Sequence, residues 1–383
     1  MNPRVKLALL GGLGWLLLSA SVEARTWQVA KDGSGDFTVI QSAVDAAASG
    51  DTILIGPGRF EEHAPFTVPG WTEEVYVGFA GSSLTLIGSG QDITVIGPVT
   101  PIHDPMEEPK GIVSVLDADL FIQGLTIENV KQAVYHDEGR IEVYHCTLQN
   151  CDTGLAAWAR RGMYMEDCII VNNISGGVIT FAPAQDIEIR NSRFCNLTGN
   201  VSFNGTANAN VYNCKFLGGA AGIAIQDISN GGVYDCQFYD LTNAGIGVGI
   251  SSSATINDNV ISGSASDIVV DTYCNVQGTG NRLKGGTYTT IRCAGSHLEM
   301  HGNHILNAGG YSVLLQAYGN PPDVIIDLSD NYWGTADEDS IDSWIWDGND
   351  TPYLHAFVQY EPFASGPIGT EQQSWGRVKA LYK

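Results

Sequence analysis

Two aromatic side chains followed by two amides carry the most suggestive chemistry in this sequence. Trp158, Phe181, Asn204 and Gln226 recur at intervals of 22 to 23 residues. Sugar rings are bound by an apolar surface that aromatic rings supply and by donors and acceptors that reach the hydroxyl groups. The four residues therefore predict a carbohydrate-binding row. If another segment covers the rings, the aromatic side chains are packing residues instead.

Four charged residues are candidates for acid–base chemistry on the same face. Asp137, Asp271 and Arg292 follow the spacing of the row, and Asp152 lies elsewhere in the repeat. Ester or glycoside hydrolysis needs one group that attacks and another that moves protons. A lyase would need a basic group, and Arg292 is the only basic residue at this spacing.

Two groups of residues have a spacing that metal ions can use. His297, Glu299 and His301 alternate along one segment and share a face, so they could hold zinc. Same-face neighbours on a flat strand diverge, however, and an ordinary polar face is the competing interpretation. Asp235 and Asp258 would stack as like charges, which calcium would relieve. Calcium is therefore the one cofactor that we consider.

All of these residues belong to a repeat of about two dozen residues. Each repeat contains a short phrase with a turn residue, and this turn column consists of Leu125, Cys146, Cys168, Ser192, Cys214, Cys236, Asn259, Asn281, Asn303 and Asn331. Apolar residues lie three positions before and two positions after each turn residue, with Gly278 as the exception. The residues between them are mostly polar, which is the alternation of a half-buried strand.

A further apolar column gives each repeat another strand. It consists of Val134, Leu155, Val178, Val201, Ile223, Ile246, Ile268, Thr289 and Val313. Coils that carry several short strands, each about 4.8 Å from the last, describe a parallel β-helix. We therefore predict an all-β fold, a single right-handed parallel β-helix (solenoid) of about ten coils with short capping helices.

The residue types in the turn column support this architecture. Asn tolerates left-handed backbone angles, and stacked Asn amides can form a hydrogen-bonded ladder along the axis. In the first half of the column Cys replaces Asn, and we interpret these Cys residues as small buried packing residues.

The chain divides into three segments. Residues 1–24 read as a signal peptide, residues 25–363 form the β-helix domain, and residues 364–383 are a linker and a short basic amphipathic tail. Within the domain, residues 38–48 and 337–346 are the expected capping helices. We therefore expect a secreted monomer, extracellular, cell-surface or periplasmic, without a transmembrane segment.

Composition limits the partners. A formal net charge of −23 argues against nucleic acid and anionic membranes, which need a basic surface. An anionic polysaccharide would be repelled unless cations bridged it, so the expected partner is a polysaccharide or surface glycan. Eight Cys in an exported chain permit disulfides, and Cys274 with Cys293 is the first pair to test.

Several segments resemble a known family. These are residues 29–44 (VAKDGSGDFTVIQSAV), 53–60 (ILIGPGRF), 84–88 (LTLIG) and 121–129 (FIQGLTIEN). They are similar to the start of pectin methylesterases, which are right-handed β-helices of the pectin-lyase-like superfamily. Residues 331–334 (NYWG) resemble the closing motif of secreted β-helix repeat proteins.

The resemblance implies some site residues of that family and lacks others. Gln132 matches the Gln of a QAV motif, which implies a role in substrate binding. The motif that supplies a second Gln and the acid/base Asp reads Cys151-Asp152-Thr153 here, so only the Asp is kept. Residues 176–181 (GGVITF) carry no carboxylate where the nucleophilic Asp belongs, and the Arg of a later LGRPW motif has no counterpart. Pectin methylesterase activity is therefore expected to be lost.

Three functions remain open from the sequence. The first is a non-catalytic secreted β-helix that binds polysaccharide along the outward face of one sheet. The second is a carbohydrate-active lyase or hydrolase of the same superfamily, and the third is a structural cell-surface spacer or adhesin.

Overall fold

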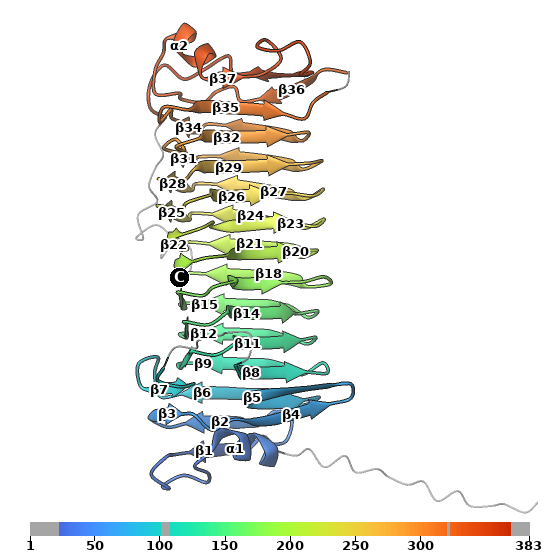
Figure 1. Ribbon diagram of the computed structural model, residues 1–383, viewed down its shortest axis with the longest axis vertical. Helices are drawn as coiled ribbons and strands as arrows, with labels where there is room; N and C mark the ends of the chain where they lie inside the picture. Colours follow the sequence, from blue (N-terminus) through green and yellow to red (C-terminus); the bar gives the residue numbers. More distant parts are fainter. Residues whose placement is uncertain (1–22, 101–107, 320–321, 369–383) are drawn as a thin grey trace, which may run out of the picture.

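A computed structural model describes residues 23–100, 108–319 and 322–368 of the chain. Strands stack one above the other along a single long axis, with the N-terminal coils at one end and the C-terminal coils at the other (Figure 1). The stack makes about 13 turns. The predicted β-helix is thus confirmed, and it is longer than ten coils because its first coils precede the repeated phrase.

Three sheets run along the molecule. Sheet A contains β1 Thr26–Val29, β2 Thr52–Ile55, β6 Leu84–Gly88, β9 Leu120–Gln123, β12 Ile141–Tyr144, β15 Met163–Glu166, β18 Gln185–Arg190, β21 Ala207–Tyr212, β24 Asn230–Tyr234, β27 Ser253–Asn257, β30 Asn275–Thr279, β33 His297–His301, β36 Val324–Asp327 and β38 Ala356–Gln359. Sheet B contains β3 Gly58–Phe60, β7 Thr94–Ile96, β10 Thr126–Glu128, β13 Thr147–Gln149, β16 Ile169–Val171, β19 Arg193–Leu197, β22 Lys215–Gly219, β25 Gln237–Tyr239, β28 Val260–Ser262, β31 Arg282–Leu283 and β34 His304–Ile305. Sheet C contains β4 Ala64–Val68, β5 Trp71–Ala80, β8 Lys110–Val115, β11 Gln132–Asp137, β14 Thr153–Trp158, β17 Gly176–Thr180, β20 Asn200–Asn204, β23 Ile223–Gln226, β26 Ala244–Val248, β29 Ser266–Asp271, β32 Thr289–Ala294, β35 Tyr311–Gln316 and β37 Ile345–Trp346. The strand pairs recorded for the described residues are parallel, apart from the antiparallel hairpin β4–β5.

The predicted apolar columns form the core between the three sheets. Their side chains are buried, and Phe194, Phe216 and Phe238 stack in successive coils with ring centroids 4.7 Å apart. One assignment was wrong, because Ile291 and not Thr289 pairs with Ile268. A shift by two residues leaves the in–out alternation unchanged, so the sequence pattern could not reveal it.

The turn column forms a continuous hydrogen-bonded ladder, as predicted. From Cys168 onward, each backbone N–H in one uninterrupted run donates to the side chain of the next turn residue: Ser192 Oγ (3.1 Å), Cys214 Sγ (3.4 Å), Cys236 Sγ (3.4 Å), Asn259 Oδ1 (2.9 Å), Asn281 Oδ1 (3.0 Å), Asn303 Oδ1 (2.9 Å) and Asn331 Oδ1 (2.7 Å). The four Cys residues of the turn column are buried, as predicted. The Sγ atoms of Cys214 and Cys236 also accept hydrogen bonds from backbone N–H groups.

The left-handed backbone angles lie one residue earlier than predicted. Asp235, Asp258 and Asp330 have φ of 54°, 60° and 58°, and each precedes a turn residue. The residue with positive φ reverses the chain, which leaves the turn residue free to point inward and join the ladder.

Both capping helices are present and shorter than predicted. Helix α1 spans Ile40–Ala46 and buries Ile40, Ala43 and Val44 against the first coils. Helix α2 spans Glu338–Ser343 at the other end and buries Ile341, and the predicted helix region continues into β37.

The predicted terminal segments fall largely outside the described residues. Most of the signal peptide (residues 1–22) and most of the tail (residues 369–383) belong to these undescribed parts. Residues 364–368 still contact the β-helix, since the Ala364 N–H donates to Asn331 O (2.9 Å) and His304 Nε2 lies 2.8 Å from Ile368 O. Among the described residues no helix is long and apolar enough to cross a membrane.

All eight Cys residues are free thiols. The Cys274–Cys293 disulfide is therefore not formed: Cys274 Sγ lies 2.8 Å from Asp271 O, and Cys293 Sγ lies 3.1 Å from the Tyr318 hydroxyl.

Candidate functional site

The outward face of sheet C brings the predicted carbohydrate-binding residues into one line. Register pairs Asp137 with Trp158 and Asn204 with Gln226, and Phe181 follows the last residue of β17. We call this line the outer row, and it consists of Asp137, Trp158, Phe181, Asn204, Gln226, Gly249, Asp271, Ala294 and Gln316.

The two aromatic rings of the outer row stack on each other. Trp158 and Phe181 have centroids 4.3 Å apart and planes 15° apart, and both side chains are half-buried. Because they occupy matching positions in successive coils, the stacking direction is the axis of the β-helix. The stack therefore turns ring edges, rather than an open ring face, toward a ligand.

The aromatic stack continues toward the N-terminus as far as the β4–β5 hairpin, which contributes Trp71. Tyr135 lies 5.5 Å from Trp158 and 5.7 Å from Trp71, and the Lys110 ammonium lies over the rings of Trp71 (4.6 Å) and Tyr135 (4.3 Å). Burial lowers the pKa of Lys110, which Glu73 at 3.5 Å partly offsets. The sequence analysis missed this cluster because only the fold places β5 beside β8.

The amides of the outer row are partly engaged with each other. Gln226 Nε2 donates to Asn204 Oδ1 (2.7 Å) and to Ser202 Oγ (3.2 Å), and Asn204 Nδ2 donates to Thr180 O (3.0 Å). Gln132 lies at the other end of β11, about 17 Å from Asp137 along the strand. Its side-chain oxygen is buried without a hydrogen-bond partner.

The catalytic candidates are not brought together into a carboxylate pair. Asp152 comes just before β14, in which Thr153 pairs with Gln132 and Trp158 pairs with Asp137. Asp152 is therefore about 20 Å from Asp137, measured along the strand direction. Asp152 also accepts a 2.5 Å hydrogen bond from Ser175 Oγ. Asp271 is six coils from Asp137, about 29 Å along the axis. Paired carboxylates of glycosidases lie about 5 to 10 Å apart.

Arg292 lies in a neighbouring column and not in the outer row. Register pairs it with Val269, and Ala294 takes the predicted place beside Asp271. The error follows from the misassigned Thr289. Arg292 is still outward and binds across the coils, with Nη2 2.8 Å from Asp271 Oδ2.

An open position interrupts the outer face between the amides and this ion pair. Gly247 and Gly249 occupy both outward positions of their coil, and nothing lies within 4 Å of where a Cβ of Gly249 would be. Gln226 and Asp271 lie one coil to either side, so their backbones are about 10 Å apart. Exposed Tyr273 (80%) and Ile250 (54%) border the same edge of the sheet.

Ile250 also holds an unfavourable backbone conformation. Its φ of 53° places a β-branched residue in the left-handed region, which is rare and costs about 1–3 kcal/mol. The same turn recurs in the coils on either side, where Ile228 (φ 64°) and Thr272 (φ 49°) also have positive φ, so this conformation belongs to the repeated turn and not to the open position alone.

The residues suggested for metal binding do not converge. His297 Nε2 lies 3.1 Å from Glu299 Oε1, whereas His301 Nδ1 lies 3.0 Å from the backbone oxygen of Ser329. Burial and the neighbouring Asp258 raise the pKa of Asp235. Within the described ranges no three His, Cys, Asp or Glu side chains are placed to hold a metal ion. Calcium binding stays an untested prediction.

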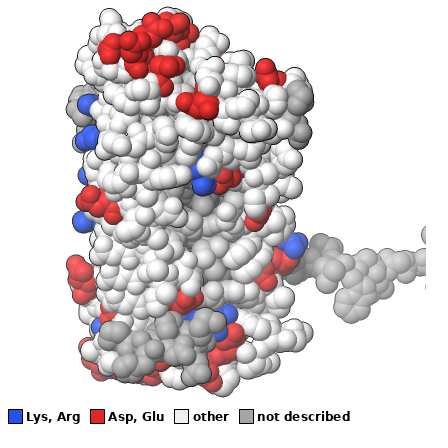
Figure 2. All heavy atoms as spheres, turned by 45° about the horizontal axis from the view of Figure 1, so that its top comes forward, with Lys and Arg blue, Asp and Glu red and all other residues white. Residues whose placement is uncertain are grey.

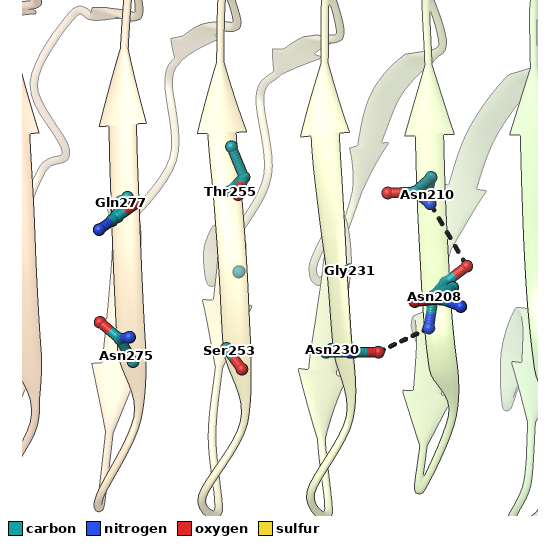
Figure 3. A pocket seen from close by; sticks show the side chains of 9 residues that line it. Asn208, Asn210, Asn230, Gly231, Ser253, Thr255, Asn275 and Gln277 are labelled. Atoms are coloured by element: carbon teal, nitrogen blue, oxygen red, sulfur yellow. Dashed lines mark hydrogen bonds between the residues drawn. The ribbon is translucent and has the colours of Figure 1, made fainter.

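A shallow groove of about 360 Å³ lies on the outward side of sheet A (Figure 3). We call it the amide groove, and it is lined by Asn208, Asn210, Asn230, Gly231, Ser253, Ala254, Thr255, Asn275 and Gln277. The sequence analysis did not identify it, although the spacing of Asn208, Asn230, Ser253 and Asn275 was a visible signal.

A buried carboxylate lies inside the β-helix. Asp267 is fully buried, and its Oδ2 accepts a hydrogen bond from the Gly285 N–H (2.9 Å), while its Oδ1 has no partner. Desolvation raises the pKa of Asp267 to about 7.

Comparisons with known proteins agree with this architecture. A family model described as the right-handed β-helix region matches residues 177–329. Probable pectinesterase 56 of Arabidopsis thaliana is 28% identical over 158 residues, covering 38% of this chain. The chain spans about half (51%) of the length of that relative.

Two solved structures that match much of this chain are an α-1,3-glucanase and an alginate lyase, and both have TM-scores below 0.5. The catalytic unit of an α-1,3-glucanase from Streptomyces thermodiastaticus strain HF3-3 is 14% identical and has a TM-score of 0.47, covering 85% of this chain and 65% of the other. An alginate lyase from Paenibacillus sp. is 14% identical and has a TM-score of 0.42, covering 76% and 98%. The matched region and the observed coils together identify the chain as a right-handed parallel β-helix protein, part of whose sequence is similar to a pectinesterase.

Proposed function

We propose that this protein is exported and binds a neutral polysaccharide, without cleaving it, across the outward face of sheet C. The observation that carries the proposal is the open position at Gly249, with an amide on one side and the Asp271–Arg292 ion pair on the other. A gap of about 10 Å between flanking backbones admits a sugar ring between side chains that can donate and accept hydrogen bonds.

The surroundings of the open position suit a polyhydroxylated ligand. Gln226 and the Asp271–Arg292 pair offer polar atoms, Tyr273 offers an exposed aromatic ring, and the Trp158–Phe181 stack adds apolar ring edges further along the row. Binding pockets for sugars combine apolar area with a few polar groups in this way.

A neutral ligand is favoured over an anionic one. The chain carries a net charge of −23, and Arg292, the cation beside the open position, is already paired with Asp271. Figure 2 shows acidic side chains gathered at the end that carries α2, whereas most of the visible middle is uncharged. An anionic chain would therefore need bridging cations such as calcium.

The geometry gives less support to the enzymatic alternatives. The pectinesterase relative suggests ester hydrolysis, but β17 has no carboxylate and the nearest candidates lie about 20 Å apart. Arg292 is held by Asp271, so its use as a lyase base would first require breaking that ion pair.

The test is a pull-down of the mature protein with cellulose, mixed-linkage β-glucan, arabinan, galactan and polygalacturonate, with and without calcium. Gly249→Phe fills the open position, and the free space there predicts that the variant folds normally. Gly366→Phe is the matched control, because a Cβ there is also free of contacts within 4 Å.

We expect a neutral polysaccharide to bind the wild type and the control at least tenfold more tightly than Gly249→Phe. Equal binding by all three proteins would refute the proposed site. Released product in the same mixtures would revive the enzyme hypothesis, and no binding to any polysaccharide would leave the spacer or adhesin hypothesis.

A further inference from the structure

The amide groove on sheet A has the composition of a second ligand site. Its polar side chains come from four adjacent strands, β21, β24, β27 and β30, and face the same side (Figure 3). Register places Asn230, Ser253 and Asn275 in one column and Thr255 and Gln277 in the next. The four strands span about 14 Å along the axis.

Much of the hydrogen-bonding capacity of this groove is unused. Within the described residues, the side chains of Ser253, Thr255 and Asn275 make no hydrogen bond to protein. Elsewhere in the groove, Asn230 Oδ1 accepts from the Asn208 N–H (2.6 Å), and Asn208 Nδ2 donates to Asp186 Oδ1 (2.9 Å). Internal bonds therefore fix one end of the groove and leave its centre free to bind a ligand.

A tyrosine borders the groove because a glycine makes room for it. Gly232 lies between Asn210 and Thr255 in their column. A Cβ atom added to Gly232 would lie only 2.2 Å from the Tyr234 hydroxyl oxygen, so a larger residue there would displace the tyrosine. The Tyr234 ring also stacks on Tyr212 at 5.0 Å. An aromatic ring and a hydroxyl thus lie beside the uncharged amides.

The groove is neutral in an acidic protein. Its polar lining is Asn, Ser, Thr and Gln. Acidic groups lie at its ends, with Asp186 and Glu188 beside Asn208 and Asn210 on one side and Glu299 beyond Gln277 on the other. Without a cation the groove has no charge to attract phosphate or uronate, and without an apolar floor it has little to offer a lipid. Amides and hydroxyls pair as donors and acceptors with the hydroxyl groups of sugars.

From these observations we infer that the amide groove binds a neutral oligosaccharide, independently of the site proposed on sheet C. The two sites lie on different sheets, so one molecule would bind two glycan segments. Simultaneous binding would raise the avidity for a polysaccharide network above the affinity of either site.

The test is isothermal titration of the full mature protein with cellohexaose, laminarihexaose and maltohexaose. Thr255→Trp blocks the centre of the groove, and Asn275→Ala with Gln277→Ala removes hydrogen-bonding groups without adding bulk. Gln359→Trp is the matched control, since Gln359 is exposed in the same outward column of sheet A, beyond Asp327.

We expect two molecules of a hexasaccharide per wild-type chain and per Gln359→Trp chain, one per chain of Thr255→Trp and one per chain of Gly249→Phe. The double alanine variant should weaken the groove site at least tenfold. If Gly249→Phe loses all binding and Thr255→Trp binds like the wild type, the amide groove is not a site and only the proposed function stands. If Thr255→Trp loses all binding and Gly249→Phe binds like the wild type, the amide groove is the site and the proposed site on sheet C is refuted. No binding of any of the three sugars would overturn this inference, whereas the proposed function would still be decided by the pull-down with arabinan and galactan.

Discussion

Replacing the buried Asp267 by Asn should change how the stability of this β-helix depends on pH. Asp267 is the second residue of β29, and its carboxyl has one hydrogen bond, from the Gly285 N–H, and one buried oxygen without a partner. Because burial disfavours the charged form, the pKa rises from 3.8 to about 7.

The sign follows from proton binding. Between pH 4 and pH 7 the folded state holds the Asp267 proton and the unfolded state does not. This contribution to stability is therefore fully present below about pH 4 and is lost as the pH rises through about 7. A pKa difference of about 3 at 1.36 kcal/mol per unit gives at most about 4 kcal/mol, a large part of a typical unfolding free energy.

The assay is urea unfolding, followed by tryptophan fluorescence, at pH 4, 5.5 and 7.5. Asn has nearly the same shape and does not ionise, so Asp267→Asn should remove this decrease in stability with pH. A buried amide donor without a partner costs about 1–3 kcal/mol at every pH, so the difference in slope between the two proteins is the result that counts. If wild type and variant lose the same stability between pH 4 and pH 7.5, then Asp267 is not protonated in the fold and the reasoning is wrong.

Three further predictions concern the interior. Burial lowers the pKa of His136 to about 4, so its contribution to stability is present above pH 6.5 and is lost as the pH falls toward 4. His136→Gln should therefore reduce the loss of stability in acid, measured by the same urea assay, and an unchanged pH profile would contradict this prediction. Asn281→Ala removes the acceptor for the Asn259 N–H (3.0 Å) and the donor to Ile256 O (2.7 Å), so the unfolding free energy should fall by about 2–4 kcal/mol. The control Asn275→Ala replaces an exposed Asn and should lower it by less than about 0.5 kcal/mol. Equal losses in the two variants would argue that the ladder does not stabilise the fold. Ellman's reagent should label at most Cys195, the one half-buried thiol, in the native protein and eight thiols after unfolding, whereas a count of six would reveal a disulfide.

The repeated pattern made most of the fold predictable. Each inward column needs apolar residues and each turn needs a residue that tolerates positive φ, so the 22-residue period and the alternation are visible in one sequence. The buried Cys and Asn ladder followed from residue type alone. The pattern did not reveal which residue takes the left-handed angle, because Asp258 and Asn259 are adjacent and both types adopt it.

The candidate site was less predictable, because it depends on register between coils. The outer row from Asp137 to Asp271 was correct, but a slip of two residues misplaced Arg292 without disturbing the alternation. The orientation of Trp158 and Phe181 also escaped prediction, since spacing places two rings near each other without saying which surface they turn outward.

The sequence alone determined the period, the inward columns, the ladder and the excess negative charge, because each depends on residue type at a fixed interval. Only the tertiary structure decided which side chains meet across coils: that Asp271 pairs with Arg292, that Gly249 leaves open space, that the centre of the amide groove stays unpaired and that Asp267 is buried. These features depend on contacts between residues more than 20 positions apart, and their energies are set by burial and register, which no local pattern contains.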